Sequence, residues 1–470
     1  MNDVVWSDAV AQAAAIRSRE ASASELVRDY LDRIERFDPV LRSYVAVDTE
    51  RAIADARDAD AIVARETSAS LPPFLGVTIS VKDVIDVAGL ATTESCKALS
   101  NNVAAVDGPL VQRFRDAGFI VLGKTNVPEF CSSMTSSELN GICRNPWDTE
   151  RTPAGSSGGA AAALAAGLCA IAHGTDGAGS VRVPASFCGL VGVKPTRGFT
   201  SFGPERGNSY YTTSVDGILC RSVRDAASAL DVYAGWFDDG ASWPGRPTAA
   251  LSDLSHDDPG RLRIGVTTNP PMGQAEDECA DAAVAVAKML ESLGHQVEER
   301  TPRWDTILVA AMGPMTVPGP AGLVGLDQLE LVEPRNRGLL ERGASLTLVE
   351  HARWVEQCRA ASLEFLELWS DIDILVTPTS GMVPPSVDWA PWNQTEEEHL
   401  TTFMTFPNFA QPFNLTGQPA FSLPLAWSAD GLPIGVQLVG RRFDEKTLLR
   451  VSAQIEGALP WVDRRPSFVS

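Results

Sequence analysis

Three serines in a glycine-rich stretch are the residues of this sequence best suited to nucleophilic chemistry. Ser156 and Ser157 lie in the motif GSSGG at 155–159, and Ser180 ends a second cluster, GTDGAGS at 174–180. Small neighbours leave backbone N–H groups beside each hydroxyl, as an acyl-transfer site with an oxyanion hole requires. The second cluster is the better candidate for an oxyanion hole, because the N–H groups of successive small residues can converge on one anion. A nucleophilic Ser180 also needs a base.

Lysine usage indicates where that base is. The 39 basic residues include only six lysines, at 82, 97, 124, 194, 288 and 446. A chain that otherwise uses arginine keeps lysine where arginine does not serve, for instance where the amine must lose its proton. Lys82 follows an alternating apolar segment at 77–81, which predicts a strand and makes Lys82 the lysine best placed for burial and a lowered pKa. On usage alone, a strand-end lysine that reaches solvent remains the alternative.

The first cluster also fits a different hydrolase mechanism. GSSGG matches G-x-S-x-G, the nucleophile elbow of α/β-hydrolases, with Ser157 as the nucleophile. That mechanism needs a histidine after the serine, and His351 and His399 follow in charged stretches with helical spacing. The five histidines form no His-x-x-x-His pair, so we expect no metal site.

Composition narrows the class of partner. The 60 acidic residues exceed the 39 basic ones, for a net charge of −21, which disfavours nucleic acid and anionic membranes as partners. The longest run of small apolar residues, 160–172, is too short to cross a bilayer. No basic n-region precedes an apolar stretch at the N-terminus, so we expect no signal peptide. Eight cysteines without a Cys-x-x-Cys motif predict free, mostly buried thiols in the cytoplasm.

Hydrophobic periodicity predicts alternating helices and strands, and therefore an α/β fold. Ser22 and Glu25 have capping-box spacing, which starts a helix that Pro39 is expected to stop. The Asp430-Gly431 dipeptide predicts a hairpin between 421–427 and 431–440. We predict further helices at 50–67, 111–117, 160–166 and 276–293, and strands at 77–82, 119–122, 190–195, 261–266, 295–300 and 372–376.

Residues 76–198 resemble the amidase signature family. The matching pieces are GVTISVKDVIDVAGLATT, GKTNVPEF, RNPWD, AGSSGGAAAALAAGL and GTDGAGSVRVPASFCGLVGVKPTRG. The helix at 24–39 and the C-terminal NLTGQPAFSLPLAW and GLPIGVQLVGRRFDE are similar to that family as well. The resemblance implies a large mixed central β-sheet between helices, in one domain spanning 1–470. We expect a signature core at 60–235, a divergent substrate-pocket region at 236–370, and C-terminal strands and a helix at 371–470 that complete the sheet.

The family motifs imply a Ser–Ser–Lys catalytic triad without a cofactor. Lys82 matches the family's base, Ser156 its bridging serine beside a cis peptide bond, and Ser180 its nucleophile. The oxyanion hole would be formed by the amides of Gly177, Ala178, Gly179 and Ser180. This chain departs from the family at two positions where glycine is usual, Ala178 and Ala154. The Ala178 methyl group narrows the pocket or limits the backbone without removing an N–H, and Ala154 matters less.

We therefore expect a hydrolase that cleaves C–N acyl bonds of linear amides through an acyl-enzyme. The segment 304–326, WDTILVAAMGPMTVPGPAGLVGL, is almost without charge and favours apolar or aryl amides and anilides; carbamates such as urethanes, and esters, stay open. Ser132 and Ser133 are candidates for contacts on the acyl side. The alternative is the A subunit of a tRNA-dependent glutamine amidotransferase. The expected partner is a small-molecule substrate, and a homodimer stays open.

Overall fold

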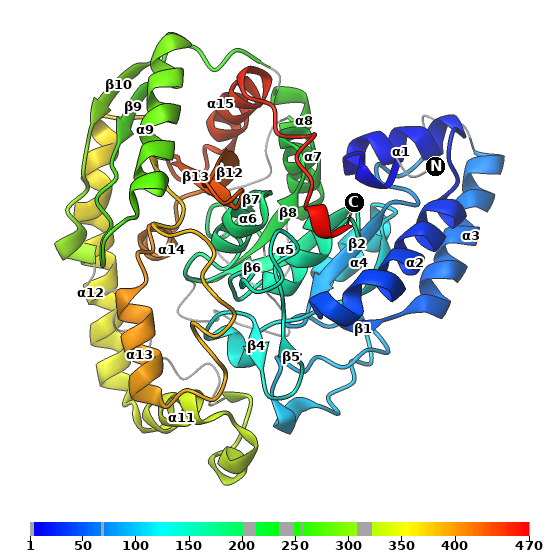
Figure 1. The fold of residues 1–470 in the computed structure, drawn as a ribbon, viewed down its shortest axis with the longest axis horizontal. Coiled ribbons are helices and arrows are strands. Elements are labelled where there is room, and N and C mark those ends of the chain that lie inside the picture. The colour runs from blue at the N-terminus through cyan, green and yellow to red at the C-terminus, as the bar shows by residue number, and fades with distance from the viewer. Residues whose placement is uncertain are drawn as a thin grey trace.

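The centre of the protein is one mixed β-sheet (Figure 1). The computed structural model describes residues 4–66, 70–200, 213–234, 249–255, 257–307 and 322–469. Within these residues the sheet has 11 strands, in the order β1-β3-β2-β6-β8-β7-β12-β13-β11-β9-β10. The strands are β1 (Tyr44–Val47), β2 (Thr78–Lys82), β3 (Ile120–Thr125), β6 (Ile171–Asp176), β7 (Val191–Lys194), β8 (Val215–Cys220), β9 (Arg263–Val266), β10 (Gln296–Glu299), β11 (Ile374–Pro378), β12 (Ala420–Trp427) and β13 (Pro433–Val439), with β4 (Ser136–Ser137) and β5 (Gly141–Ile142) in a separate pair.

Strand direction brings the candidate site residues to one edge of this sheet. β2 pairs in parallel with β3 on one side and with β6 on the other. The carboxyl ends of β2 and β6, at Lys82 and Asp176, therefore lie at the same edge. β6, β8, β7, β12, β13 and β11 follow in antiparallel pairs, and β11, β9 and β10 are again parallel.

Helices surround the sheet. In Figure 1 the N-terminal helices gather at one end of the molecule, and α9 and α12 lie at the other end, near β9 and β10. The helices are α1 (Ala9–Ser18), α2 (Ala23–Leu41), α3 (Thr49–Arg65), α4 (Pro109–Asp116), α5 (Gly158–Ala165), α6 (Arg182–Cys188), α7 (Val223–Tyr233), α8 (Leu251–Leu254), α9 (Asp277–Ser292), α11 (Pro334–Ser345), α12 (Leu348–Leu366), α13 (Glu396–Thr405), α14 (Pro412–Leu415) and α15 (Glu445–Ala458).

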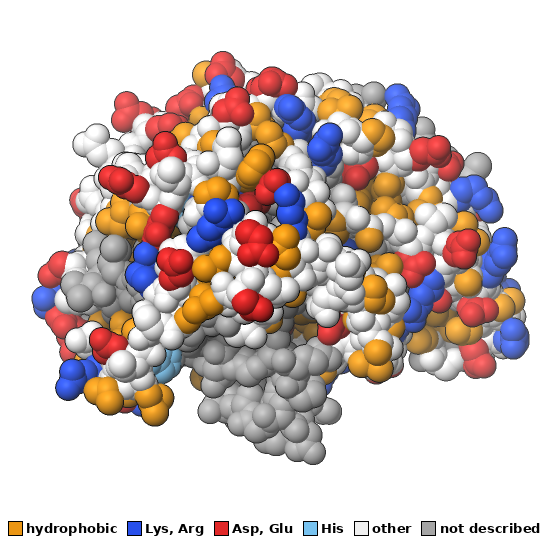
Figure 2. Space-filling view, turned by 90° about the horizontal axis from the view of Figure 1, so that it is seen from below, with side chains coloured by type: hydrophobic (Ala, Val, Ile, Leu, Met, Phe, Trp, Pro, Cys, Tyr) orange, Lys and Arg blue, Asp and Glu red, His pale blue; other side chains and the backbone are white. Residues whose placement is uncertain are grey.

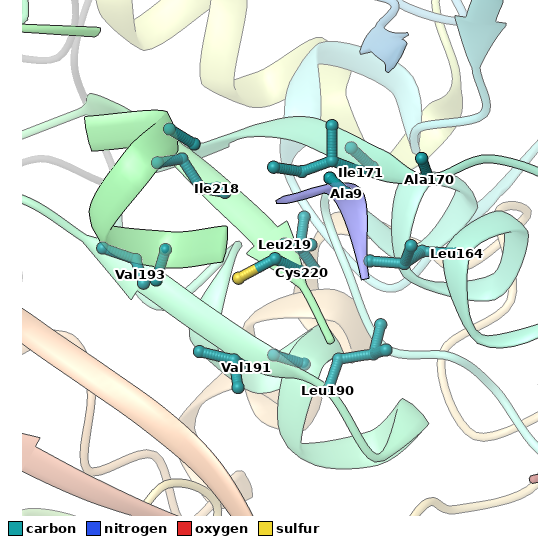
Figure 3. Packing of buried hydrophobic residues seen from close by; sticks show 14 of the residues in the cluster. Ala9, Leu164, Ala170, Ile171, Leu190, Val191, Val193, Ile218, Leu219 and Cys220 are labelled. Atoms are coloured by element: carbon teal, nitrogen blue, oxygen red, sulfur yellow. The ribbon is translucent and has the colours of Figure 1, made fainter. Parts of the chain in front are cut away.

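One hydrophobic core holds these layers together. It extends from Val5 near the N-terminus to Val469 near the C-terminus. Figure 3 shows part of it, which includes Ile171 of β6, Ile218 of β8 and Leu164 of α5. All eight residues of α5 are buried, which explains why this helix consists of alanine, glycine and one leucine. Helix α5 therefore packs closely behind β6 and supports the segment that carries the serines.

The structure confirms most of the predicted elements. β12 and β13 form the predicted antiparallel hairpin, and the Ser22–Glu25 capping box starts α2. The prediction that Pro39 stops this helix is wrong, because α2 continues to Leu41. Pro39 lies in the last turn, where the helix ends soon in any case, and the chain leaves it at Arg42 in a left-handed conformation. Helices α11, α12 and α13 were not predicted.

The surface carries charges of both signs. On the face drawn in Figure 2, acidic and basic side chains intermingle with scattered apolar ones. Among the described residues, no helix is both long and apolar enough to span a bilayer. Seven of the eight cysteines are buried and all are free thiols, as predicted; Cys131 is half-buried.

Candidate active site

Lys82 is the last residue of β2, and its side chain is fully buried. Its Nζ lies 2.7 Å from Ser156 Oγ, 2.7 Å from Thr175 Oγ1 and 3.3 Å from the Thr175 carbonyl oxygen. A neutral amine can donate two hydrogen bonds and accept one, so these three oxygens suit an uncharged Lys82 that accepts from the Ser156 hydroxyl. The alternative of a solvent-reaching lysine is excluded by this burial.

The surroundings of Lys82 favour its uncharged form. Burial lowers the pKa of Lys82, while the nearby Cys131 thiol and the carboxylates of Asp176 and Glu94 act in the opposite direction. The carboxylate adjacent in sequence, Asp83, does not offset this, because it pairs with Lys124 at 2.9 Å and both side chains are fully buried. Lys82 has no ion-pair partner among the described residues, and burial therefore determines the direction of its pKa shift.

Ser156 follows a cis peptide bond between Gly155 and Ser156, where the resemblance predicted one. The structure leaves no room for a side chain at 155, since a Cβ there would lie 2.1 Å from the Ser133 carbonyl oxygen. Ser156 is 1% exposed, and its hydroxyl contacts Lys82. The next residue, Ser157, donates its N–H to the Ser180 carbonyl oxygen at 3.2 Å. The two serine segments are therefore fastened to each other through the main chain.

Ser180 lies in the loop between β6 and α6, and it is half-buried. An ion pair holds this loop: Arg182 donates to both carboxylate oxygens of Asp176, at 2.9 and 2.8 Å, inside the protein. Asp176 also accepts the N–H groups of Val181 and Arg182, and the charge of Arg182 is the main cause that holds its pKa below the usual range against the effect of burial. The Ser180 hydroxyl makes no hydrogen bond to another described residue.

The four candidate oxyanion amides are not equivalent. The N–H of Gly179 donates to Asp176 Oδ1 at 2.8 Å, so the expectation that Gly179 supplies an oxyanion donor needs correction. The amides of Gly177, Ala178 and Ser180 have no acceptor among the described residues. Gly179 instead provides a conformation: its φ is +109°, which favours glycine, whereas Ala178 has no such φ. Glycine is therefore required at 179 and not at 178.

Ser132 and Ser133 lie beside this site and remain candidates for substrate contact. Both are half-buried, and the Ser132 hydroxyl donates to the Glu129 carbonyl oxygen at 3.0 Å. The Ser133 main chain packs against Gly155, as described above. The predicted substrate-pocket region, 236–370, lies partly outside the described residues.

Four residues at the site were not predicted. Thr175 contacts Lys82 through two oxygens, and the Cys131 thiol is close enough to influence it. Two asparagines donate from the C-terminal part: Asn408 to the Ala178 carbonyl oxygen and Asn414 to the Asp176 carbonyl oxygen, each at 2.8 Å. Thr175 lies inside the quoted GTDGAGS motif and Asn414 inside NLTGQPA, so the sequence held a signal for both. Cys131 and Asn408 carried none.

The α/β-hydrolase alternative is not supported. Ser157 is fully buried, and its hydroxyl donates to the Thr175 carbonyl oxygen at 3.3 Å. Neither His351 nor His399 bonds to it within the described part of the chain, and His399 is buried rather than exposed. Burial, with the charge of Arg335, lowers the pKa of His399 to about 4.

An apolar cluster adjoins the two serine segments. Its buried members include Ala154, Val183 and Ala410, and Met134, Met382 and Trp389 pack against them while remaining partly exposed. Ala154 directly precedes Gly155, and Ala410 lies where a side chain at Gly179 would point. This cluster places hydrocarbon next to the two serine segments.

Comparison with known proteins indicates which family the chain belongs to. The Amidase family profile matches residues 25–449. The chain is 38% identical to a putative amidase, AmiB2, of Mycobacterium tuberculosis, over 99% of each chain. It is 36% identical to the 6-aminohexanoate-cyclic-dimer hydrolase of Paenarthrobacter ureafaciens, over 99% of this chain and 97% of that one.

Solved structures give the same result. A structure of 6-aminohexanoate cyclic dimer hydrolase with its substrate superposes with a TM-score of 0.90 and 34% identity, over 99% of this chain and all of that one. The A subunit of the glutamyl-tRNA(Gln) amidotransferase of Thermotoga maritima gives a TM-score of 0.75 and 28% identity, over 93% of this chain and 92% of that one. The chain belongs to the amidase signature family of amide hydrolases.

Proposed function

We propose that this protein hydrolyses linear amides with Ser180 as nucleophile, Ser156 as bridging acid and base, and Lys82 as the base. The observation that carries the proposal is the 2.7 Å contact between Lys82 Nζ and Ser156 Oγ, in a site whose burial lowers the pKa of the amine. Arginine could not replace Lys82, since a guanidinium does not lose its proton in proteins.

In the proposed reaction, neutral Lys82 accepts the Ser156 proton, and Ser156 takes the Ser180 proton as Ser180 attacks the carbonyl carbon. The resulting oxyanion accepts hydrogen bonds from the free amides of Gly177, Ala178 and Ser180, each worth about 3 kcal/mol in comparable sites. Ser156 then protonates the leaving nitrogen, and the C–N bond breaks to give an acyl-enzyme. Water repeats the route and releases the acid. The two hydroxyls must come within hydrogen-bond reach when substrate binds, as catalytic hydrogen bonds commonly do.

The proposed substrates are apolar or aryl amides and anilides, with carbamates such as urethanes and esters as related acyl compounds. The apolar cluster around Ala154, Val183 and Ala410 supports this class, because it offers hydrocarbon surface beside the serines. Stand-alone hydrolysis is favoured over the amidotransferase role by the higher TM-score to a hydrolase, 0.90 against 0.75.

A fluorophosphonate probe tests the nucleophile without knowledge of the substrate. We expect peptide mapping to find the label on Ser180, no labelling of Ser180→Ala, and normal labelling of Ser186→Ala, which removes a buried hydroxyl of α6 that accepts from Gly435 N–H. Label on Ser157 or another serine would overturn the assignment.

A substrate panel tests the reaction class. Matched aryl amide, carbamate and ester substrates, together with glutamine, are assayed with the wild-type protein alone. We expect turnover of the amide and little ammonia from glutamine. Rapid release of ammonia from glutamine, with no turnover of the acyl compounds, would favour the amidotransferase role instead.

A further inference from the structure

His173 and Asp216 form a buried pair that the proposed reaction does not use. His173 lies on β6 and Asp216 on the neighbouring β8, and their side chains are 0% and 2% exposed. The His173 Nε2 is 3.0 Å from Asp216 Oδ1. In the antiparallel register of these strands Asp216 lies opposite Thr175, the residue that contacts the Lys82 amine.

The other nitrogen of His173 reaches the main chain of Lys82. The Lys82 N–H donates to His173 Nδ1 at 3.3 Å. The main-chain ladder between β2 and β6 ends two residues earlier, at Ser80 and Ala172. An imidazole therefore accepts the Lys82 N–H just beyond the point where β6 stops pairing with β2. The series Asp216, His173 and Lys82 connects three adjacent strands at the edge that carries the site.

These two bonds determine the tautomer of His173. Because Lys82 N–H is a donor, Nδ1 must carry a lone pair, and the single ring proton lies on Nε2 and points to Asp216. The ring is kept neutral, since burial lowers the pKa of His173 and the charge of Lys124 acts in the same direction, against Asp216. Phe114 and Tyr233 enclose the ring at centroid distances of 6.1 and 6.4 Å.

We propose that His173 and Asp216 are positioning residues that hold the main chain of Lys82 so that its amine reaches Ser156. The inference rests on the proposed function, because it concerns the base of that reaction. Asp216 fixes the tautomer, Nδ1 holds the Lys82 N–H, and Thr175 on the same strand holds the amine at the other end of the lysine. Side chains of β6 thus form hydrogen bonds with both the main chain and the side chain of Lys82.

Two replacements of His173 separate positioning from packing. His173→Phe fills the space of the ring and removes the acceptor, whereas His173→Asn leaves a cavity but places an amide oxygen about where Nδ1 lies. Tyr233→Phe is the matched control. The ring of Tyr233 contacts the His173 imidazole, and the substitution removes only a buried hydroxyl, which donates to the Gly217 carbonyl oxygen. The readouts are the rate of fluorophosphonate labelling of Ser180 across pH and thermal unfolding followed by circular dichroism.

If His173 positions Lys82, the two His173 variants should rank in opposite orders by labelling rate and by thermal stability. His173→Phe should label more slowly, and His173→Asn should be less stable. We expect His173→Phe to label about 100-fold more slowly, since small displacements of catalytic groups have effects of this size. The acid limb of its pH–rate profile for labelling should move to higher pH, because a Lys82 amine that is less firmly enclosed has a higher pKa. His173→Asn should label within about threefold of Tyr233→Phe although its cavity makes it the less stable variant.

Each possible result of these labelling experiments either supports or overturns the inference. Labelling of His173→Phe at the rate and pH profile of Tyr233→Phe would overturn the inference, as would equal loss in His173→Asn and His173→Phe. If His173→Phe does not fold, His173→Asn decides alone: a rate below about a third of the Tyr233→Phe rate overturns the inference, and a higher rate supports it. Absence of label on Ser180 in the wild-type protein would instead contradict the proposed function.

Discussion

Lys82 is surrounded by oxygens of Ser156 and Thr175 and has no carboxylate at ion-pair distance among the described residues. The nearest carboxylate in sequence, Asp83, is neutralised by Lys124. A buried amine without a counter-ion destabilises the folded protein when it is protonated, because the charge is removed from water without compensation. In the proposed reaction the same arrangement makes the amine available as a base, so activity and stability would place opposite demands on this residue.

Replacing Lys82 with methionine should abolish activity and change how stability depends on pH. We expect Ser180 labelling to fall at least about 1,000-fold, as for loss of a general base. In the wild-type protein the unfolded chain holds the lysine proton up to about pH 10.4, whereas the folded chain releases it at lower pH. Wild-type stability therefore gains with rising pH over that interval. Lys82→Met lacks this gain, so its stability relative to wild type should decrease from neutral pH towards pH 10.

Urea denaturation at several pH values measures this difference. Lys288→Met, at an exposed position of α9, is the control and should follow the wild-type curve. A constant difference between Lys82→Met and wild type across this range would show that the amine is charged in the folded protein, which contradicts its assignment as base.

Gly179 and Ala178 should respond differently to substitution. A Cβ at 179 would lie 2.8 Å from Ala410 Cβ and 3.1 Å from Val183 Cγ2, at a φ of +109°. We expect Gly179→Ala to lose roughly 2–3 kcal/mol of unfolding free energy and to label about 100-fold more slowly. The reason is that the nucleophile loop, residues 177–181 with the proposed nucleophile Ser180, must shift. Ala178→Gly should keep the labelling rate within about threefold. Similar behaviour of the two variants would argue against the different backbone requirements assigned here.

The three residues proposed as catalytic could be selected from the sequence because each lies in a short motif. Lys82, Ser156 and Ser180 were all found in this way, and the structure brings the first two into contact. The use of the Gly179 amide by Asp176 could not be predicted, since it depends on how the loop closes. Asn408 could not be found for a similar reason: it lies 230 residues from Ala178 in sequence, and only the fold brings the two together.

At the scale of elements, carboxylates gather where α1 and α7 begin. Asp225 accepts the N–H groups of Ala9 and Val10 at the start of α1, and Glu456 of α15 accepts that of Val223 at the start of α7. Asp8 lies between them and pairs with Arg224. Helix N-termini favour negative charge, but burial raises the pKa of Asp225 and that of Glu456 to about 7 each. Asp225 and Glu456 therefore ionise near neutral pH at a cost to stability.

Removing the charge of Glu456 should stabilise the protein only at the higher pH. The pKa of Glu456 is raised in the folded protein, so between about pH 5 and pH 8 the folded state loses a proton that the unfolded state has already released, and wild-type stability falls. Glu456→Gln keeps an oxygen for the Val223 N–H and avoids that fall. Because Glu456 is partly exposed, we expect a gain of about 1 kcal/mol at pH 8 and little at pH 5.

Chemical denaturation at these two pH values provides the measurement, and Glu291→Gln at an exposed position of α9 is the control. A gain of equal size at both pH values would mean that the effect does not arise from ionisation of Glu456.

Helices and strands with a clear hydrophobic periodicity or turn signal could be predicted from the sequence, and those without such a signal could not. β2, α5 and the β12–β13 hairpin followed from alternation, alanine content and the Asp430-Gly431 turn. α12 was missed because most of its residues are exposed and its surface carries isolated apolar side chains such as Leu348 and Leu363, which obscure the helical period. The order of strands depends on pairings between distant segments, for which local patterns hold no signal.

At the scale of the whole molecule, residues from both the N-terminal and the C-terminal half of the chain build the region around the site. β7 pairs with β12, so that Lys194 lies opposite Ala420 in the middle of the sheet. Arg182 beside the nucleophile loop donates to Asn414 and Gln437, more than 230 residues away, at 2.6 Å each. These bonds are buried, and the main hydrophobic cluster likewise contains residues from both ends of the chain. The C-terminal strands thus support the nucleophile loop directly.

Such an arrangement predicts that the protein unfolds in one step despite its 470 residues. Chains of this length commonly unfold through intermediates, but here neither half retains a complete sheet or nucleophile loop without the other. Three probes should give the same urea midpoint: far-ultraviolet circular dichroism for helices, tryptophan fluorescence, and the capacity of Ser180 to react with a fluorophosphonate. Tryptophan fluorescence reports largely on the C-terminal half, since Trp304, Trp354, Trp369, Trp389, Trp392, Trp427 and Trp461 lie there. Loss of Ser180 reactivity well before the fluorescence change would show that the nucleophile loop opens independently, and that the bonds from Arg182 to Asn414 and Gln437 do not couple it to the C-terminal strands.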